Sequence, residues 1–482
     1  MLTLGILIEA LTGQAATAYT HSALTRQVLT DAVVDSRLAI PGCLFVALRG
    51  ERTDGHEFVA DAFERGAAVA LVEREIPGFA TLDLRPGAGL PATQPVGGGR
   101  AALHLCVCVE DVLKALQAAA RHWRRQLEGL RVIGITGSVG KSTTKELVAS
   151  VLASHAPTLS SESSFNNEIG LPLTLLKATR AHRYAVLEMG FYVPGDVALL
   201  CDIAAPQVGV VTMIGPVHLE RAGSLEAIAQ GKAELVEALP EDGVAVLNAD
   251  DERVMAMRGL TRARVFTFGL EPQADLWASD VKSLGLEGMH FQVHTRRETL
   301  HLRVPLLGQH SVHTALRAAA VGLVEGLTWQ EILDGLQAPS TQLRLMTVTG
   351  PNNSLIIDDT YNASPDSMIA ALNLLVEIEG RHIAVLGDML ELGEFEERGH
   401  RMVGARAAQA ADILVTVGTR ARWIAEEAQL QGLSSVRIAT VASAEEAQAF
   451  LQQQVREGDV VLIKGSHALR LDSLVAALEM DA

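Results

Sequence analysis

The feature that most constrains the fold is a glycine-rich turn between a strand pattern and a helix pattern. Residues 134–142 read Gly-Ile-Thr-Gly-Ser-Val-Gly-Lys-Ser, with an apolar run at 132–136 and a helix-compatible run at 143–153. Such a turn collects backbone N–H groups at the positive end of a helix, where they bind phosphate. The strict pattern G-x-x-x-x-G-K-[ST] is missed by one position, because Ile135 stands where its first glycine belongs. The strand and helix on either side nevertheless favour a nucleotide loop over a chance glycine-rich turn.

We expect this loop to bind ATP. Lys141 would neutralise the outer phosphates, and Ser142 would bind a magnesium ion. The predicted nucleotide contacts are Thr136, Gly137, Ser138, Val139, Gly140, Lys141, Ser142 and Thr143.

The length of 482 residues exceeds what one hydrophobic core usually organises. Apolar strand patterns alternate with helix patterns, which is typical of parallel α/β sheets. We predict an α/β protein of three domains. Residues 1–108 form a small N-terminal α/β substrate domain, 109–338 a central P-loop ATPase-like domain with a mostly parallel sheet, and 339–482 a C-terminal Rossmann-like α/β domain. The Pro/Gly-rich stretch 85–100 is predicted to be a surface loop.

Composition excludes several classes of protein. An apolar fraction of 48% with 20% charged residues fits a globular chain rather than a disordered one. The formal charge of −17 disfavours nucleic acid and anionic lipid as partners. The first residues carry no cationic start and reach an acid at Glu9, so neither a signal peptide nor a spanning helix fits. We expect a cytoplasmic monomer.

The cysteines favour reduced thiols. Of the four, only Cys106 and Cys108 are close in sequence, and they lie inside an apolar run without a second pair. Buried free thiols are therefore favoured over a metal site.

Further segments resemble the Mur ligase family of ATP-dependent amide ligases, and the resemblance covers nearly the whole chain. Asp35-Ser36-Arg37 and Asp54-Gly55-His56 resemble the module that holds the uridine part of the sugar nucleotide. The resemblance implies that Ser36 binds substrate. Turns and helix caps also use these residue types.

Two central segments extend the resemblance. Residues 164–174 resemble the family's N-x-N-N-x-I-G-x-P segment, with Ser164 in place of the first asparagine, which implies substrate contacts for Asn166 and Asn167. Glu188 ends a strand where open α/β sheets bind ligands, and a carboxylate there can complete a magnesium shell. Paired asparagines also form turns, and acids also cap strand ends.

His218 and Lys232 lie in a further matching segment. In the family the matching histidine binds a second magnesium ion, and the matching lysine carries a carbamate formed with carbon dioxide. The resemblance implies both roles here, so Ser142, Glu188, His218 and Lys232 are the predicted metal ligands. In isolation the pair would instead be a loop histidine and a solvent-exposed helix lysine.

The most discriminating string is Asp-Asp-Thr-Tyr-Asn-Ala-Ser-Pro-Asp-Ser-Met at 358–368, which resembles the family branch that adds D-alanyl-D-alanine. The resemblance places Asp359 on the ribose or metal shell of ATP, and Tyr361, Asn362 and Lys464 on substrate. Arg344 and Lys464 are candidate phosphate cations delivered by domain closure. Two adjacent acids at a strand end are otherwise a solubility feature or a helix cap.

One segment departs from the family pattern. Residues 308–316 align with G-x-H-N-x-x-N-A, but Ser311 and Thr314 replace the two asparagines. In relatives the first asparagine reads adenine. Losing such a hydrogen bond costs about 1–3 kcal/mol, so either ATP binds weakly or another residue reads the base. Likewise Leu343 stands where the family often has glycine before Arg344.

The resemblance implies a ligase that joins D-alanyl-D-alanine to UDP-N-acetylmuramoyl-tripeptide through an acyl phosphate, with ATP and two magnesium ions. Lys141, Glu188, His218 and Lys232 would be its catalytic residues. The alternatives are another Mur-type or folylpolyglutamate-type amino acid ligase, a catalytically weakened Mur-like binding protein, and a small-molecule kinase.

Overall fold

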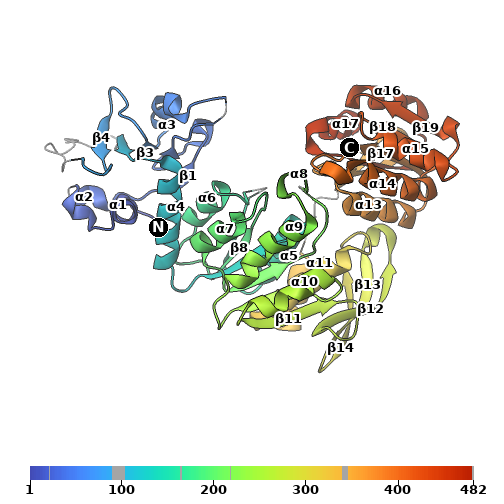
Figure 1. Ribbon diagram of the computed structural model, residues 1–482, viewed down its shortest axis with the longest axis horizontal. Coiled ribbons are helices and arrows are strands. Elements are labelled where there is room, and N and C mark those ends of the chain that lie inside the picture. Colours follow the sequence, from blue (N-terminus) through green and yellow to red (C-terminus); the bar gives the residue numbers. More distant parts are fainter. Residues whose placement is uncertain are drawn as a thin grey trace. The chain divides into compact units, whose positions relative to one another are not determined.

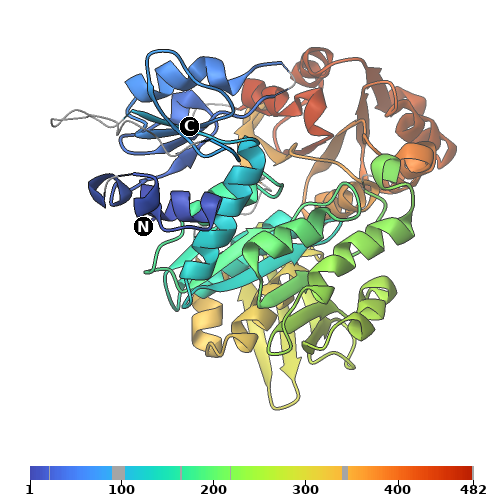
Figure 2. The same ribbon diagram turned by 60° about the vertical axis from the view of Figure 1, so that its left-hand side comes forward.

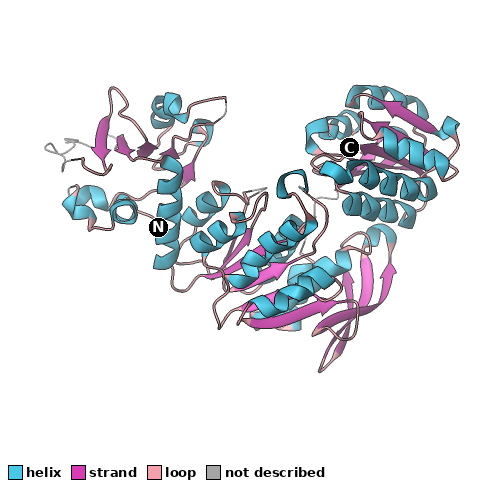
Figure 3. Ribbon diagram, viewed as in Figure 1, coloured by secondary structure: helices cyan, strands magenta, loops and turns pink. Residues whose placement is uncertain are grey.

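The computed structural model describes residues 1–20, 22–50, 52–88, 104–162, 165–217, 219–338 and 346–479. It is an α/β protein with three mostly parallel sheets, which confirms the predicted fold class (Figures 1 and 3). Ser164, His218, Leu343, Arg344 and most of the 85–100 loop lie outside the described residues. No helix in the described ranges is both long enough and apolar enough to span a membrane.

Packing divides the chain into two compact units. One comprises Met1–Gly134, Ala156–Gly190 and Asp196–Gln207; the other comprises Ile135–His155, Phe191–Gly195 and Val208–Ala482. The division falls within strand β6 (Arg131–Thr136). It differs from the predicted limits after residues 108 and 338, and the three-domain division remains a prediction.

The first unit begins with a five-stranded sheet in the order β1-β2-β3-β5-β4, whose pairings are parallel. Phe45 and Phe63 belong to its core, together with Cys43, Cys106 and Cys108. The cysteines are buried and free, as predicted. The elements are β1 (Ala32–Val33), β2 (Leu44–Val46), β3 (Val69–Val72), β4 (Ala80–Asp83), β5 (Leu105–Cys108), α1 (Leu4–Thr12), α2 (Ser22–Thr25) and α3 (Val59–Glu64).

A nine-stranded sheet has the order β14-β13-β12-β11-β10-β9-β6-β8-β7. Its strands are β6, β7 (Thr158–Ser160), β8 (Tyr184–Glu188), β9 (Val208–Val211), β10 (Val244–Asn248), β11 (Arg264–Gly269), β12 (Leu276–Ser283), β13 (Met289–Thr295) and β14 (Thr299–Val304). The pairs β7–β8, β9–β10, β10–β11 and β11–β12 are parallel. The apolar run at 132–136 corresponds to β6.

The antiparallel edge β12–β13–β14 was not predicted, and its hairpin is yellow in Figures 1 and 2. Its signal is strict alternation along β13, where Met289, Phe291 and Val293 are buried while the residues between them are partly exposed. That period of two is the pattern of a strand with one buried face.

Helix α4 (Val112–Gln126) packs on α6 (Gly170–Leu176) and α7 (Asp196–Ala204) in the first unit. Arg124 on α4 is buried and donates hydrogen bonds to the carbonyl oxygens of Ala204 at 2.9 Å, Leu127 at 3.2 Å and Ala205 at 3.4 Å. These carbonyls end α7 and α4, where the helix dipole is negative. Arg124 is therefore a structural arginine whose charge is met by two helix ends.

Helix α5 (Lys141–Ala153) follows the glycine-rich loop and packs on α11 (Ser311–Val324) and α12 (Trp329–Leu336). The approach of α12 requires Gly335, since an added Cβ there would lie 2.3 Å from Cα of Val151. Ser150 Oγ also donates to the Gly335 carbonyl at 2.7 Å. These contacts fix α5, and with it the loop. The remaining central helices are α8 (Leu219–Ala222), α9 (Leu225–Glu237) and α10 (Glu252–Ala256).

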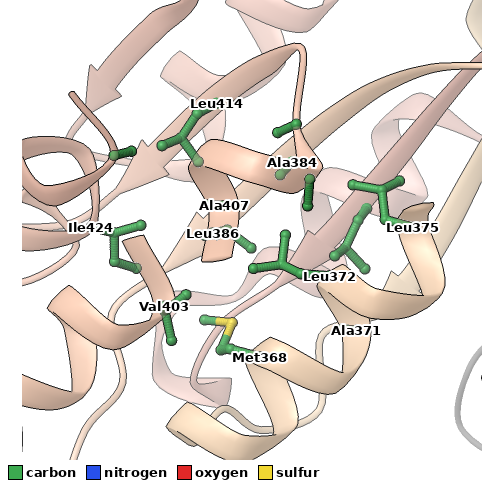
Figure 4. Packing of buried hydrophobic residues seen from close by; sticks show 14 of the residues in the cluster. Met368, Ala371, Leu372, Leu375, Ala384, Leu386, Val403, Ala407, Leu414 and Ile424 are labelled. Carbon is green, nitrogen blue, oxygen red and sulfur yellow. The ribbon is translucent and has the colours of Figure 1, made fainter. Parts of the chain in front are cut away.

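The last sheet has the order β15-β16-β20-β17-β18-β19, in which only the edge pair β15–β16 is antiparallel. Helices cover both faces. Figure 4 shows Met368, Leu372 and Val403 gathered on Leu386 at one face, while the other face packs on α16 and α17. The elements are β15 (Met346–Gly350), β16 (Ser354–Asp359), β17 (Arg381–Gly387), β18 (Ile413–Val417), β19 (Ile438–Val441), β20 (Asp459–Lys464), α13 (Pro365–Glu377), α14 (Glu396–Ala410), α15 (Arg422–Leu430), α16 (Ala444–Gln454) and α17 (Leu471–Leu478).

Candidate active site

The phosphate loop has the backbone that its glycines predict. Gly137 and Gly140 have φ angles of 145° and 82°, a region that favours glycine. An added Cβ on Gly137 would lie 1.8 Å from Oγ1 of Thr212, so this position also has no room for a side chain. The loop ends where Lys141 begins α5, and Ser142 is buried in the first turn of that helix. This arrangement fits a nucleoside phosphate.

Side-chain hydroxyls hold the loop in shape. Thr212 Oγ1 donates to the Val139 carbonyl at 2.7 Å, and Thr144 Oγ1 donates to the Gly140 carbonyl at 2.6 Å. Ser138 Oγ donates to the carbonyl oxygen of Gly215 at 2.9 Å, and the Gly215 N–H donates back to it at 2.9 Å. Two of these hydroxyls bind carbonyls of the loop and the third ties Ser138 to Gly215, which favours a preformed phosphate site. Sequence reasoning did not identify Thr212, since nothing along β9 signals its distant partner.

Two lysines share one acceptor in the loop. Nζ of Lys141 donates to the Gly137 carbonyl at 2.8 Å, and Nζ of Lys232 donates to the same oxygen at 2.9 Å. Lys232 lies on α9, is only 1% exposed, and has its Nζ 5.0 Å from the centre of the Phe191 ring. Lys232 is therefore a buried helix residue that contacts the phosphate loop, and not a solvent-exposed lysine. Two ammonium groups that donate to the same oxygen repel each other.

Glu188 and the paired asparagines lie together in the first unit. The Glu188 side chain is 2% exposed, and its Oε1 accepts a hydrogen bond from Asn166 Nδ2 at 2.9 Å. Asn167 has a different role, because its Oδ1 accepts from the N–H of Gly170 at 2.9 Å and of Ile169 at 3.3 Å. Asn166 therefore orients the carboxylate, whereas Asn167 holds the turn that leads into α6.

These two roles give a matched pair of variants. We expect Asn166→Ala to lower ligase kcat/KM about tenfold, because an unoriented carboxylate binds a cation or substrate less well. Asn167→Ala should instead lower the free energy of unfolding by about 1 kcal/mol. Urea unfolding and initial rates measured on both variants check this. Equal activity losses in the two would contradict the distinction.

Ser311 is the first residue of α11, and its Oγ is buried without a hydrogen-bond partner among the described residues. Buried hydroxyls usually have a partner, so this orphan fits a polar ligand atom. Thr314 is buried one turn later and accepts a hydrogen bond from Nη2 of Arg317 at 3.0 Å. Sequence reasoning missed Arg317, whose signal is a lone charge in the apolar run Ala-Leu-Arg-Ala-Ala-Ala.

The C-terminal motif ties two strand ends together. Nζ of Lys464 lies 2.7 Å from Oδ2 of Asp359 and donates to the Asn362 carbonyl at 2.8 Å. Lys464 is 2% exposed, whereas Tyr361 is 40% exposed. Ser364 forms a capping box that starts α13. The charge of Lys464 is thus already met within this motif.

In the first unit, Ser36 is buried, and the buried His56 ring links Asp54 to the backbone of Glu73. Nδ1 of His56 lies 2.6 Å from Oδ1 of Asp54, and its Nε2 accepts the Glu73 N–H at 2.8 Å. Burial alone would raise the pKa of Asp54, but hydrogen bonds from His56 and the charge of Arg74 bring it to about 2. The segment Asp54-Gly55-His56 thus stabilises its own turn through hydrogen bonds between Asp54 and His56.

Three family profiles match successive parts of the chain. They are the Mur ligase family catalytic domain at residues 33–80, the Mur ligase middle domain at 135–322, and the Mur ligase glutamate ligase domain at 343–467. The middle-domain match begins within β6 and contains residues 135–142 of the phosphate loop.

Relatives align along the whole chain. A UDP-N-acetylmuramoyl-tripeptide–D-alanyl-D-alanine ligase from Mycobacterium tuberculosis is 38% identical over 100% of this chain and 98% of its own length. The ligase of the same name from Escherichia coli is 33% identical over 94% of each chain.

Solved structures agree with the sequence matches. A crystal structure of MurF from Acinetobacter baumannii has a TM-score of 0.82 at 30% identity, covering 99% of this chain and 98% of its own. MurF from Thermotoga maritima in complex with ADP has a TM-score of 0.75 at 28% identity, covering 92% and 96%. With profiles, full-length relatives and architecture in agreement, the chain belongs to the Mur ligase family.

Proposed function

We propose that this chain is an ATP-dependent ligase that adds D-alanyl-D-alanine to UDP-N-acetylmuramoyl-tripeptide in peptidoglycan precursor synthesis. The observation that carries the proposal is the 38% identity along the whole chain to a ligase of that name. The preformed phosphate loop supplies the ATP site that such a ligase requires. We further propose that the protein works as a cytoplasmic monomer on these small-molecule substrates.

The reaction has two steps. The terminal carboxylate of the tripeptide attacks the γ-phosphorus of ATP, ADP leaves, and an acyl phosphate forms. The amine of D-alanyl-D-alanine then attacks the acyl carbon, the carbon–oxygen bond to phosphate breaks, and the amine loses a proton as the amide forms. No protein nucleophile is needed, so the protein acts by positioning and by charge.

Two anionic reactants must meet in the first step. Lys141, at the start of α5, neutralises the phosphate chain from the loop. Ser142, Glu188, His218 and Lys232 would hold two magnesium ions, and the hydroxyl and carboxylate oxygens of this set suit that cation. Bound magnesium would supply charge neutralisation between the phosphoryl group and the acceptor carboxylate.

We also propose that Lys232 carries a carbamate. Its ammonium lies beside that of Lys141, on one shared carbonyl. Carbamylation joins Nζ to carbon dioxide with the loss of two protons and turns the repulsion between the two side chains into attraction.

The remaining contacts divide between nucleotide and substrates. Thr136, Ser138, Val139 and Thr143 complete the phosphate site, Ser311 contacts the base, and Arg344 and Asp359 contact the outer nucleotide. Substrate contacts fall to Ser36, Asn166, Asn167, Tyr361, Asn362 and Lys464. In this proposal the three domains are 1–108, 109–338 and 339–482, and the last closes over the acyl phosphate to exclude water.

Amine-dependent phosphate release tests the function. With ATP and UDP-N-acetylmuramoyl-tripeptide present, we expect D-alanyl-D-alanine to drive phosphate release and an amide product seen by mass spectrometry. D-Alanine, glutamate and L-alanyl-L-alanine are the control amines. Preference for a single amino acid would indicate a sister ligase or a folylpolyglutamate-type enzyme. Phosphate release that does not depend on the amine would refute the proposed ligase function.

The folylpolyglutamate alternative shares the architecture. The Mycobacterium tuberculosis folylpolyglutamate synthase has a TM-score of 0.60 at 18% identity, a likeness of fold alone. The weakened binding protein is motivated by Ser311 and Thr314, and it predicts nucleotide binding without turnover in the same assay.

A further inference from the structure

Arg317 is a buried cation without an acidic partner. It lies on α11 with 6% of its surface exposed, and no carboxylate among the described residues pairs with it. Its Nε donates to the His313 carbonyl at 3.0 Å, and its Nη2 donates to Thr314 Oγ1 at 3.0 Å. Buried charges are normally paired, so this one lacks its counter-charge.

The guanidinium lies against the phosphate loop. An added Cβ on Gly140 would lie 3.0 Å from Nη1 of Arg317, which is the guanidinium nitrogen without a hydrogen bond to any described residue. Gly140 is the residue before α5, so a positive helix end and a cation lie side by side. That pairing is unfavourable until an anion binds. Burial lowers the pKa of Arg317 to about 9, which leaves it charged at neutral pH.

Arg124, which is also buried, has a purely structural role. Arg124 donates from all three of its nitrogens to carbonyls at two negative helix ends. Arg317 instead has one carbonyl, one hydroxyl and the face of Phe268, whose ring centre is 6.0 Å from its Cζ. The positive charge of Arg317 can therefore be neutralised by an anion that binds at the phosphate loop.

We propose that Arg317 is a nucleotide-positioning residue whose counter-charge is the phosphate chain of the bound nucleoside triphosphate. The proposal rests on the proposed function and deepens it. It also gives Thr314 a role, because its hydroxyl holds the guanidinium beside the loop. A fixed charge here compensates for the missing asparagine amide at Ser311.

The proposal predicts effects of opposite sign on stability and on affinity. Replacing Arg317 with methionine removes an unpaired buried charge, so the protein without nucleotide should melt at the same or a higher temperature. The same change should weaken ATP binding about tenfold to hundredfold, as expected for a lost charge-assisted hydrogen bond. The affinity for adenosine, which has no phosphate, should fall by less than about threefold. Arg317→Lys should recover most of the ATP affinity.

Calorimetric titration with ATP and adenosine, thermal melting without ligand, and the KM for ATP against kcat test this in the full chain. Arg124→Met is the matched control, and it should lower the melting temperature while leaving ATP affinity unchanged. An unfolded or strongly destabilised Arg317→Met protein would overturn the proposal, as would equal losses for ATP and adenosine. Unchanged ATP affinity in an active ligase would refute it while leaving the proposed function intact.

Discussion

Lys141→Met is expected to lower kcat/KM for ATP-driven amide formation by about 10²–10³-fold, the usual loss when one fixed electrostatic contact to a developing charge is removed. Lys141 begins α5, so its ammonium adds to the positive helix end where the outer phosphates are expected. Methionine keeps much of the length and apolar stem but removes the charge. The loss should therefore appear mainly in the chemical step and less in the binding of the peptide substrate.

Initial rates at varied ATP check the prediction. Lys114→Met is the control, because Lys114 is a lysine on α4 whose side chain is 81% exposed, and its removal should leave the rates unchanged. Far-UV circular dichroism and urea unfolding should show Lys141→Met folded, since the hydrogen bonds from Thr212, Thr144 and Ser138 still hold the loop. A folded Lys141→Met protein with near-normal kcat/KM would remove Lys141 from the mechanism and revive the weakened binding protein.

The parts of this fold that depend on local sequence could be predicted. The apolar run at 132–136 matches β6 within one residue, and the helix expected from 143 begins at Lys141. Glycines at 137 and 140 predicted the loop because their backbone conformations are rarely open to other residues. Strand, turn and helix are each encoded within a few neighbouring residues here.

The contacts that build the site could not be predicted in the same way. Lys232 reaches Gly137 across 95 positions of the chain, and Thr212 reaches Val139 across 73. Such contacts depend on how strands are ordered in the sheet, which local patterns do not carry. Arg317 was missed for the same reason, since a charge in an apolar helix identifies no partner. The motif resemblance placed Lys232 near the reaction, but only the structure reveals its shared carbonyl.

Replacing Lys232, which donates to that carbonyl, is the second change for which a large effect is expected. Lys232→Ala is expected to lower kcat by about 10²–10³-fold, because the proposed carbamate, which would help to hold a cation beside the phosphoryl group, would be lost. The side chain is 1% exposed, so the alanine leaves a cavity next to Gly137. A short carboxylic acid can enter that space and supply the oxygens of the proposed carbamate. Formate or acetate at millimolar concentration should therefore restore part of the rate.

Rates measured with sodium formate, sodium acetate and sodium chloride at equal ionic strength separate rescue from a salt effect. Lys141→Met should gain nothing from the acids, because it lacks a cation rather than a carboxylate. Removing dissolved carbon dioxide should lower the rate of the unmodified protein and leave Lys232→Ala unaffected. If the acids do not restore the rate of Lys232→Ala, and removing carbon dioxide does not lower the rate of the unmodified protein, Lys232 acts as an ammonium. Both ammonium groups would then stay on the Gly137 carbonyl, beside the expected phosphate site.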